Sequence, residues 1–155
     1  LLQCSMKSFA ALYRTLDETT KTNDKLVAMV DYFKTESAED AIWAVYFLSG
    51  QRLKRLVNTT LLRGWAAARS GIPLWLFEET YHWVGDLAET LSLVVPSSAT
   101  ETKGSLQEWV TQRLMPLSKT PPEMLAGTMD QLWHDCGPQE RFVLMKLITG
   151  SMRVG

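Results

Sequence analysis

The residues with the clearest chemical use are cations that precede hydroxyl groups at a helix start. Within residues 51–60, Arg52, Lys54 and Arg55 come just ahead of two threonines, of which Thr59 is the first. A helix N-terminus offers free N–H groups and a partial positive charge, and both favour phosphate. Lys54 and Arg55 would each neutralise one backbone phosphate. The alternative remains open that a threonine only caps the helix and that Lys54 is only a solvated side chain.

The C-terminal end has the same chemical character. Residues 146–155 run from a helix into a loop with two cations, Lys146 and Arg153, and with glycines at Gly150 and Gly155. Glycines let backbone N–H groups approach a phosphate closely. A glycine after a helix is also a common C-cap, so this simpler interpretation remains open.

The charge distribution supports one cationic surface rather than a uniformly basic protein. The formal net charge is −1, which argues against a histone-like binder. No acid occurs between Asp40 and Glu78, whereas that interval holds five basic residues. Such a segment presents either a surface for a polyanion or a solvated helix face.

The elements that must position these residues are predicted to be helices. Apolar residues recur with helical spacing, and no segment alternates as a half-buried strand does, so we expect an all-α bundle of about eight or nine helices. The apolar stripes lie at residues 9–16, 26–33, 41–48, 61–71, 73–81, 86–91 and 142–148, and two more helices begin at 105–108 and 120–123.

Local signals add detail to this expectation. Residues 41–48 are apolar nearly all round and predict a central, buried helix behind a capping box formed by Ser37 and Asp40. The Ser/Thr-x-x-Glu patterns at residues 105–108 and 120–123 predict two further capping boxes. The loop at residues 96–104 divides the chain into a larger and a smaller helical half.

Several kinds of active site are not indicated. The sequence has no phosphate-binding glycine loop, no dinucleotide fingerprint and no nucleophile elbow. His134 and Cys136 lack the second pair of ligands that a zinc site needs. Two cysteines do not make a disulfide framework, which favours a reducing cytoplasmic compartment. The longest apolar run, residues 41–48, is far shorter than a membrane span. A binding module is therefore favoured over an enzyme.

Six stretches, taken together, are similar to a known family. They are FAALY at 9–13, LDETTKTN at 16–23, KRLV at 54–57, WLFEETY at 75–81, VGDLAET at 84–90 and FVLMKLITGSMRVG at 142–155. Over residues 6–155 the chain resembles the N-terminal DNA-binding domain of ATP-dependent DNA ligases, in particular the bacterial type. Residues 1–5 are interpreted as an extension outside that domain. Because the family's domain continues beyond the final glycine loop, we expect the chain to stop before the domain ends.

The resemblance implies an all-α domain that lies on the minor-groove side of nicked duplex DNA and contacts mainly phosphates. It also implies a role in nick sealing during replication, repair and recombination, in a bacterial cytoplasm near the nucleoid. The adenylation chemistry belongs to a following nucleotidyltransferase domain with a Lys-x-Asp-Gly motif. That motif is absent here, so no catalytic residue is carried over. ATP and Mg²⁺ are implied for that catalytic domain, and no cofactor or metal is expected in this chain.

Three chemical roles are assigned to the DNA-binding candidates that the resemblance implies. Cations would pair with phosphates, glycines would present backbone N–H groups, and hydroxyls would donate hydrogen bonds. The candidates are Arg52, Lys54, Arg55, Thr59, Gly85, Lys146, Thr149, Gly150, Ser151, Arg153 and Gly155. The expected partners are duplex DNA, preferably nicked, and the catalytic domains of the ligase, with no membrane. The alternative is a helical protein-interaction module that does not bind DNA.

Overall fold

The structure, a computed structural model, describes residues 5–54 and 56–154. All regular elements within these ranges are helical, which confirms the all-α prediction. They are α1 (Met6–Glu18), α2 (Thr22–Thr35), α3 (Ala38–Leu48), α4 (Thr59–Ser70), α5 (Leu74–Val84), α6 (Leu87–Val94), α7 (Leu106–Glu108), the π-helical η1 (Trp109–Leu114), the 3₁₀-helical η2 (Met115–Lys119), α8 (Pro122–Asp135) and α9 (Arg141–Thr149).

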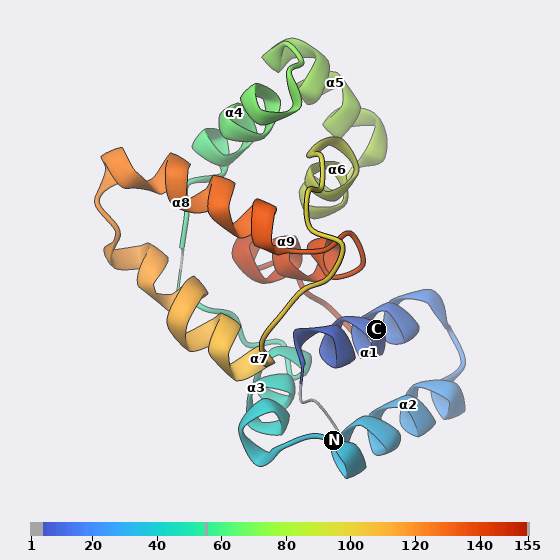
Figure 1. Cartoon of the computed structure of the whole chain (residues 1–155). Coiled ribbons are helices and arrows are strands. Elements are labelled where there is room, and N and C mark those ends of the chain that lie inside the picture. Colours follow the sequence, from blue (N-terminus) through green and yellow to red (C-terminus); the bar gives the residue numbers. More distant parts are fainter. Residues whose placement is uncertain (1–4, 55, 155) are drawn as a thin grey trace.

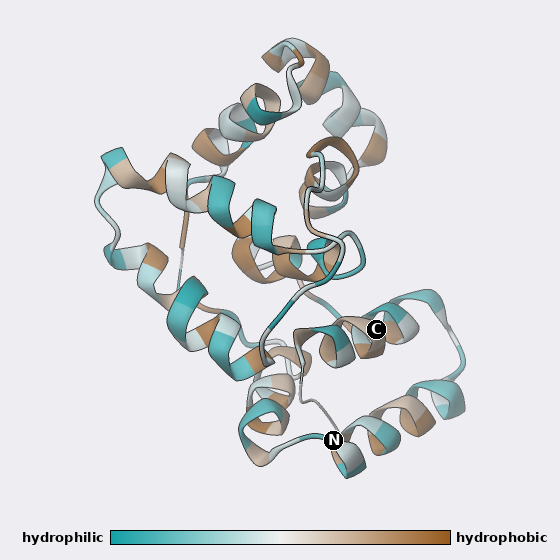
Figure 2. Ribbon diagram, in the orientation of Figure 1, coloured by the Kyte–Doolittle hydropathy of each residue, from teal (hydrophilic) through white to brown (hydrophobic). Residues whose placement is uncertain are grey.

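Helix α9 lies at the centre of the molecule (Figure 1). It packs most extensively against α6, while α1 with α2 and α4 with α5 form hairpins at opposite ends. Seven of the nine residues of α9 are buried, and most of its ribbon is coloured as hydrophobic (Figure 2). Buried side chains from both sides of the loop at residues 96–104 form one cluster, so the two helical halves share a single core.

The prediction that residues 41–48 form a central buried helix is wrong. In α3 only one face is covered, through Ala44 and Phe47, whereas Ile42 is 68% exposed and Val45 is 55% exposed. The physical reason is that an apolar composition does not determine how many neighbours surround a helix. Helix α3 lies at the edge of the molecule, where it contacts α7 on one side (Figure 1).

The three predicted capping boxes have different outcomes. Ser105 and Glu108 form the complete box. The Ser37 hydroxyl accepts from the Asp40 N–H at 3.3 Å, but the buried Asp40 carboxylate accepts from the N–H groups of Leu106 and Gln107 at 3.2 and 3.0 Å. Asp40 therefore fixes α3 to the start of α7.

The predicted box at residues 120–123 is wrong. Helix α8 begins after Pro121, which has no side-chain cap, and the Thr120 hydroxyl donates to the Pro116 carbonyl at 2.9 Å. That hydroxyl is thus used by the preceding 3₁₀ helix instead of by α8.

A buried arginine fixes the start of the central helix. Arg141 is 2% exposed, and its guanidinium donates to the carbonyls of Val95, Trp133 and Cys136. Those carbonyls belong to the ends of α6 and α8 and to the turn before α9. Because buried carbonyls need donors, this one side chain holds three chain segments around the beginning of α9.

Within residues 5–54 and 56–154, no helix combines the length and the apolar character that crossing a lipid bilayer requires.

Candidate nucleic-acid interface

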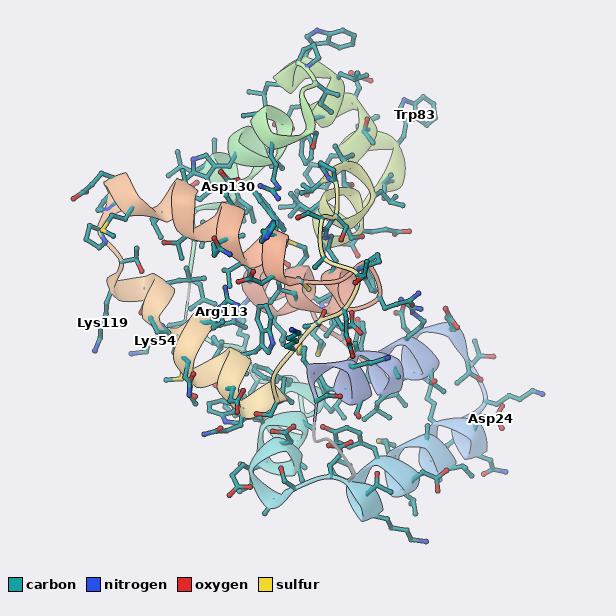
Figure 3. The ribbon with its side chains drawn as sticks, in the orientation of Figure 1. Asp24, Lys54, Trp83, Arg113, Lys119 and Asp130 are labelled. Carbon is teal, nitrogen blue, oxygen red and sulfur yellow. The ribbon has the colours of Figure 1, made fainter. Side chains whose placement is uncertain are left out.

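The connector before α4, which comprises residues 51–58 and is described except for residue 55, forms one wall of a groove, and the end of α9 forms the other. Its volume is about 600 Å³, and its lining consists of Arg52, Leu53, Lys54, Val57, Thr59, Ile148, Thr149 and Gly150. Five of the residues predicted from the sequence thus lie together, although they come from two segments far apart in the chain. Lys54 projects to the outside of the molecule (Figure 3).

The described backbone of the connector is held in place, while the side chains of Arg52 and Lys54 remain exposed. Leu56 and Val57 are buried in the core. The Tyr46 hydroxyl donates to the Arg52 carbonyl at 3.0 Å, and the Gln51 N–H donates to the Tyr46 carbonyl at 3.2 Å. Fixed backbone with exposed side chains is the arrangement that lets a cation reach a ligand at a defined place.

The other described cations between Asp40 and Glu78 form ion pairs within the protein. Arg63 pairs with Glu78 at 2.9 Å, and Arg69 approaches Asp130 at 3.5 Å. By contrast, no carboxylate in the described ranges lies within ion-pair distance of Arg52 or Lys54. Their charge is therefore available to an external anion. Arg55, predicted with them, lies outside the described residues.

The cap of α4 differs from the prediction. Asn58, not Thr59 or Thr60, is the N-cap residue, and its Oδ1 accepts from the N–H groups of Thr60 and Leu61 at 2.8 and 3.3 Å. Thr59 is the first helical residue, and its side chain lines the groove. Asparagine and threonine are both capping residues, so local sequence alone does not choose between adjacent positions.

The two helix ends at the groove carry opposite partial charges. The N-terminus of α4 is partially positive, whereas the C-terminus of α9, at Thr149 and Gly150, is partially negative. These contributions oppose each other at the groove. Its net positive character therefore comes from the side chains of Arg52 and Lys54.

Gly150 permits a close contact between the two walls. Its φ of +67° lies in the left-handed region, and a Cβ placed on it would lie 3.3 Å from Cδ of Arg52. Its amide, however, caps α9 by donating to the Lys146 carbonyl. The predicted role of Gly150 as an N–H donor to phosphate is therefore wrong. Its structural contribution is to leave room for the Arg52 side chain.

The same correction applies to Gly85. Its N–H donates to the Tyr81 carbonyl at 2.8 Å as the C-cap of α5, so it is not presented to a ligand. Gly85 lies outside the lining of the groove, although it directly precedes Asp86, which contacts Lys146.

Lys146 does not join the exposed cations. Its side chain is almost fully buried, its ammonium group pairs with the Asp86 carboxylate, and Nζ lies 5.2 Å from the ring centre of Phe142. Asp86 also caps α6 by accepting from the Ala88 N–H at 3.0 Å. No local pattern predicts this ion pair, because its members are 60 positions apart.

Among the last candidates, Thr149 lines the groove, whereas Ser151 and Arg153 lie outside its lining. The Thr149 hydroxyl donates to the Met145 carbonyl at 2.8 Å and lies 2.7 Å from the hydroxyl of Ser151. Arg153 is exposed, and its carbonyl accepts from the Tyr13 hydroxyl at 3.5 Å, away from the groove lining. Burial, and then the charge of Asp17, raise the pKa of Tyr13, which keeps its hydroxyl a donor. Gly155 lies outside the described residues.

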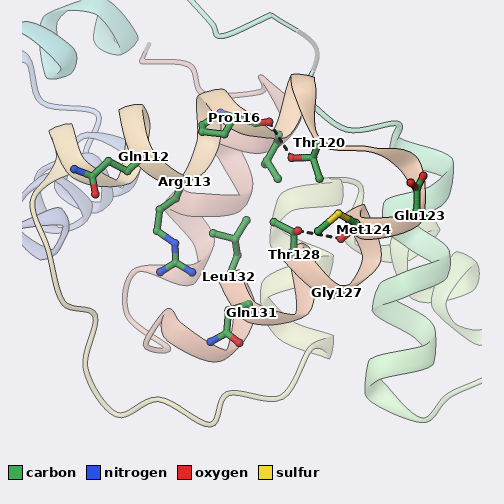
Figure 4. A pocket seen from close by; sticks show the side chains of 11 residues that line it. Gln112, Arg113, Pro116, Thr120, Glu123, Met124, Gly127, Thr128, Gln131 and Leu132 are labelled. Carbon is green, nitrogen blue, oxygen red and sulfur yellow. Dashed lines mark hydrogen bonds between the residues drawn. The ribbon is translucent and has the colours of Figure 1, made fainter.

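A second hollow, of about 510 Å³, lies between residues 112–120 and α8 (Figure 4). Its one cation, Arg113, pairs with Asp135 at 2.7 Å and lies 4.6 Å from the Trp109 ring centre. The carboxylate of Glu123 also lines this hollow. Its lining is therefore less suited to phosphate than the groove beside Arg52.

Among the described residues, no three His, Cys, Asp or Glu side chains lie close enough together to hold a metal ion. No curated protein matches the chain significantly. A family model described as the DNA ligase N terminus matches residues 5–155. That match spans nearly the whole chain and includes both walls of the groove. The chain therefore belongs to the family of DNA ligase N-terminal domains.

Proposed function

We propose that this chain is a non-catalytic domain that binds duplex DNA, preferably nicked, through the phosphate backbone. It would act on the minor-groove side and position the DNA for the catalytic domains of an ATP-dependent ligase of the bacterial type. ATP and Mg²⁺ would act in the following nucleotidyltransferase domain. Nick sealing in replication, repair and recombination would then be the role of the whole enzyme, in a bacterial cytoplasm near the nucleoid.

One observation carries the proposal. Arg52 and Lys54 are exposed, have no ion-pair partner among the described residues, and line a groove together with the hydroxyl-bearing Thr59. Cations of this kind bind phosphates without reading base sequence, so affinity would fall steeply with salt and differ little between sequences. With few phosphate contacts, the dissociation constant is expected to be about micromolar or weaker at physiological salt.

The direct test is fluorescence anisotropy with a labelled nicked duplex across a salt series. We compare the unaltered protein with Arg52→Ala/Lys54→Ala. The control is Lys7→Ala/Lys34→Ala, which removes two exposed cations from α1 and α2, outside the groove. The groove variant is expected to reduce the slope of log affinity against log salt by about 2, because each phosphate contact contributes about 0.9.

The control variant should bind as the unaltered protein does. Equal losses in the two variants would mean that overall charge, rather than the groove, is responsible for binding. Absence of binding at low salt by the folded protein would contradict the proposal.

A protein-interaction module is the second candidate, because α5 carries two exposed tryptophans. Trp75 is 66% exposed and Trp83 is 83% exposed, and Trp83 projects away from the molecule (Figure 3). Exposed aromatic side chains are frequent where proteins associate. Replacing both by glutamine should leave DNA binding unchanged if the groove is the DNA site. Loss of DNA binding in that variant, with the groove variant unaffected, would favour α5 as the functional surface.

A further inference from the structure

The groove that Arg52, Lys54 and Thr59 line is called the basic groove here. An apolar groove adjoins it on the other side of the connector. Its volume is about 530 Å³, and its apolar lining consists of Ile42, Trp43, Tyr46, Leu53, Leu56 and Met115. Ile42 is 68% exposed and Met115 is 45% exposed, so the apolar surface is open to solvent. The indole of Trp43 stacks on Phe47 with ring centres 5.8 Å apart, which fixes the aromatic wall in place.

The two grooves share one wall. Arg52, Leu53 and Lys54 line both of them, so the apolar groove begins where the basic groove ends. No carboxylate is among the residues that line the apolar groove. A ligand with phosphates beside Arg52 and Lys54 therefore passes into the apolar groove without meeting a repelling charge.

The chemistry of the shared wall restricts the occupant. It must carry negative charges at the connector and flat or apolar groups next to them. A paired duplex keeps its bases inside the helix, whereas an unpaired strand exposes a π-face at every nucleotide. Aromatic side chains flanked by cations are the surfaces on which unpaired bases stack. An acidic, amphipathic peptide also matches the apolar lining, but its charges do not follow the regular spacing of a phosphate backbone.

We propose that the apolar groove binds unpaired nucleotides that continue from a duplex whose backbone lies in the basic groove. Bases would stack on the wall formed by Trp43 and Tyr46, while their phosphates remain at Arg52 and Lys54. This inference rests on the proposed DNA-binding function. It makes the preferred ligand a duplex with a short unpaired tail at a nick or an end.

The test compares two labelled duplexes of the same paired sequence, one fully paired and one with a short unpaired tail that contains 2-aminopurine. The tailed duplex is expected to bind about tenfold tighter, since stacking of one base is enough for such a factor. The fluorescence of the 2-aminopurine should fall on binding, because that base fluoresces weakly when stacked.

Two variants of the apolar groove test whether the unpaired tail binds there. Ile42→Ser/Met115→Ser changes exposed side chains that the core does not need, and Trp43→Leu removes the aromatic wall. Both should lose most of the preference for the tail while they keep their affinity for the paired duplex. The control is Val45→Ser/Leu93→Ser, which changes exposed apolar residues outside the groove and should keep the preference.

The possible failures are distinguishable. Equal, salt-dependent binding of both duplexes would overturn this inference and leave the proposed function intact. A tail preference that persists in both groove variants would overturn it as well, because the tail would then bind elsewhere. Binding of an acidic amphipathic peptide in place of the tail would assign the groove to a protein partner. If neither duplex binds, the proposed function itself fails.

Discussion

The connector with the start of α4 and the end of α9 both combine cations with hydroxyl groups, yet the structure gives their cations different roles. In the connector, Arg52 and Lys54 point to solvent without an ion-pair partner among the described residues. In α9, Lys146 is buried against Phe142 and paired with Asp86. A cation next to glycine and hydroxyl groups is thus not by itself a phosphate site. Whether such a cation can bind phosphate depends on whether a carboxylate of the same protein already pairs with it.

The two segments also contribute to the proposed DNA-binding groove in two different ways. The connector supplies charge to the groove, whereas α9 supplies shape, because Gly150 leaves the space that the Arg52 side chain occupies. Charge contributions should appear in the salt dependence of binding. Shape contributions should appear as a change in affinity at constant salt dependence.

The largest effect is expected from reversing the charges of the connector. Arg52→Glu/Lys54→Glu replaces two attractions to phosphate by two repulsions and should lower affinity for duplex DNA by about a hundredfold at low salt. Both side chains are exposed, so the thermal unfolding temperature should change little. Anisotropy titration measures the affinity, and circular dichroism measures the unfolding. Retained affinity in this variant would remove the connector from the DNA-binding surface.

A smaller effect is expected from Gly150→Ala, for which the protein offers a matched control. Gly71 has nearly the same backbone conformation, with φ +70° against +67°, but open space around its Cβ position. Alanine at either position should cost about 1–2 kcal/mol of stability, because both are left-handed. Only Gly150→Ala contacts Arg52 and should weaken DNA binding. Chemical denaturation and anisotropy test the pair, and equal effects on DNA would contradict the shape role.

Asp86→Asn, unlike the preceding variants, is expected to raise the affinity for DNA. Asparagine keeps the cap of α6, since its side-chain oxygen also accepts from an N–H, but it removes the negative charge that neutralises Lys146. Because the protein becomes more positive by one charge, affinity for DNA should rise about threefold, whereas the salt slope should change by less than about 0.9, the value for one phosphate contact, since the Lys146 side chain stays buried. Anisotropy across a salt series measures both quantities. A lower affinity would mean that Lys146 contributes to binding only in its paired state.

The smallest effect is expected from Cys136, which belongs to neither segment. Burial raises the pKa of its thiol to about 11, so it stays protonated at pH 8. Its contribution to stability is present below pH 9 and is lost as the pH rises through about 11. In a Cys4→Ser variant, a thiol reagent at pH 8 should react only after unfolding and should not change DNA binding. Fast labelling of the folded protein would show that the thiol is accessible.

The sequence predicted those parts of the fold that depend on neighbouring residues. Helical spacing of apolar residues located the helices, and the box formed by Ser105 and Glu108 is present as predicted. The hydroxyls and cations of the groove were also found, because their residue types and order are visible in the sequence. Their meeting in one groove depended on how residues 51–59 and α9 pack, which no local pattern contains.

Two of the errors share one physical cause, which is that a side chain can pair with a residue far away in the sequence. The Asp40 carboxylate contacts the start of α7, and Asp86 holds Lys146 from 60 positions away. The burial of α3 was overestimated because only the face with Ala44 and Phe47 is covered, whereas Ile42 and Val45 remain exposed. Glycine amides were predicted to be free donors, but Gly150 uses its amide to cap its own helix.

The central claim is that duplex DNA lies in the groove between the connector and the end of α9. NMR of isotope-labelled protein, titrated with a nicked duplex, tests it most directly. The account predicts that amide signals of residues 51–54, 59 and 149–151 shift most, while those of α8 along the second hollow stay in place. Shifts concentrated along α5 near Trp75 and Trp83, with the groove unchanged, would contradict it.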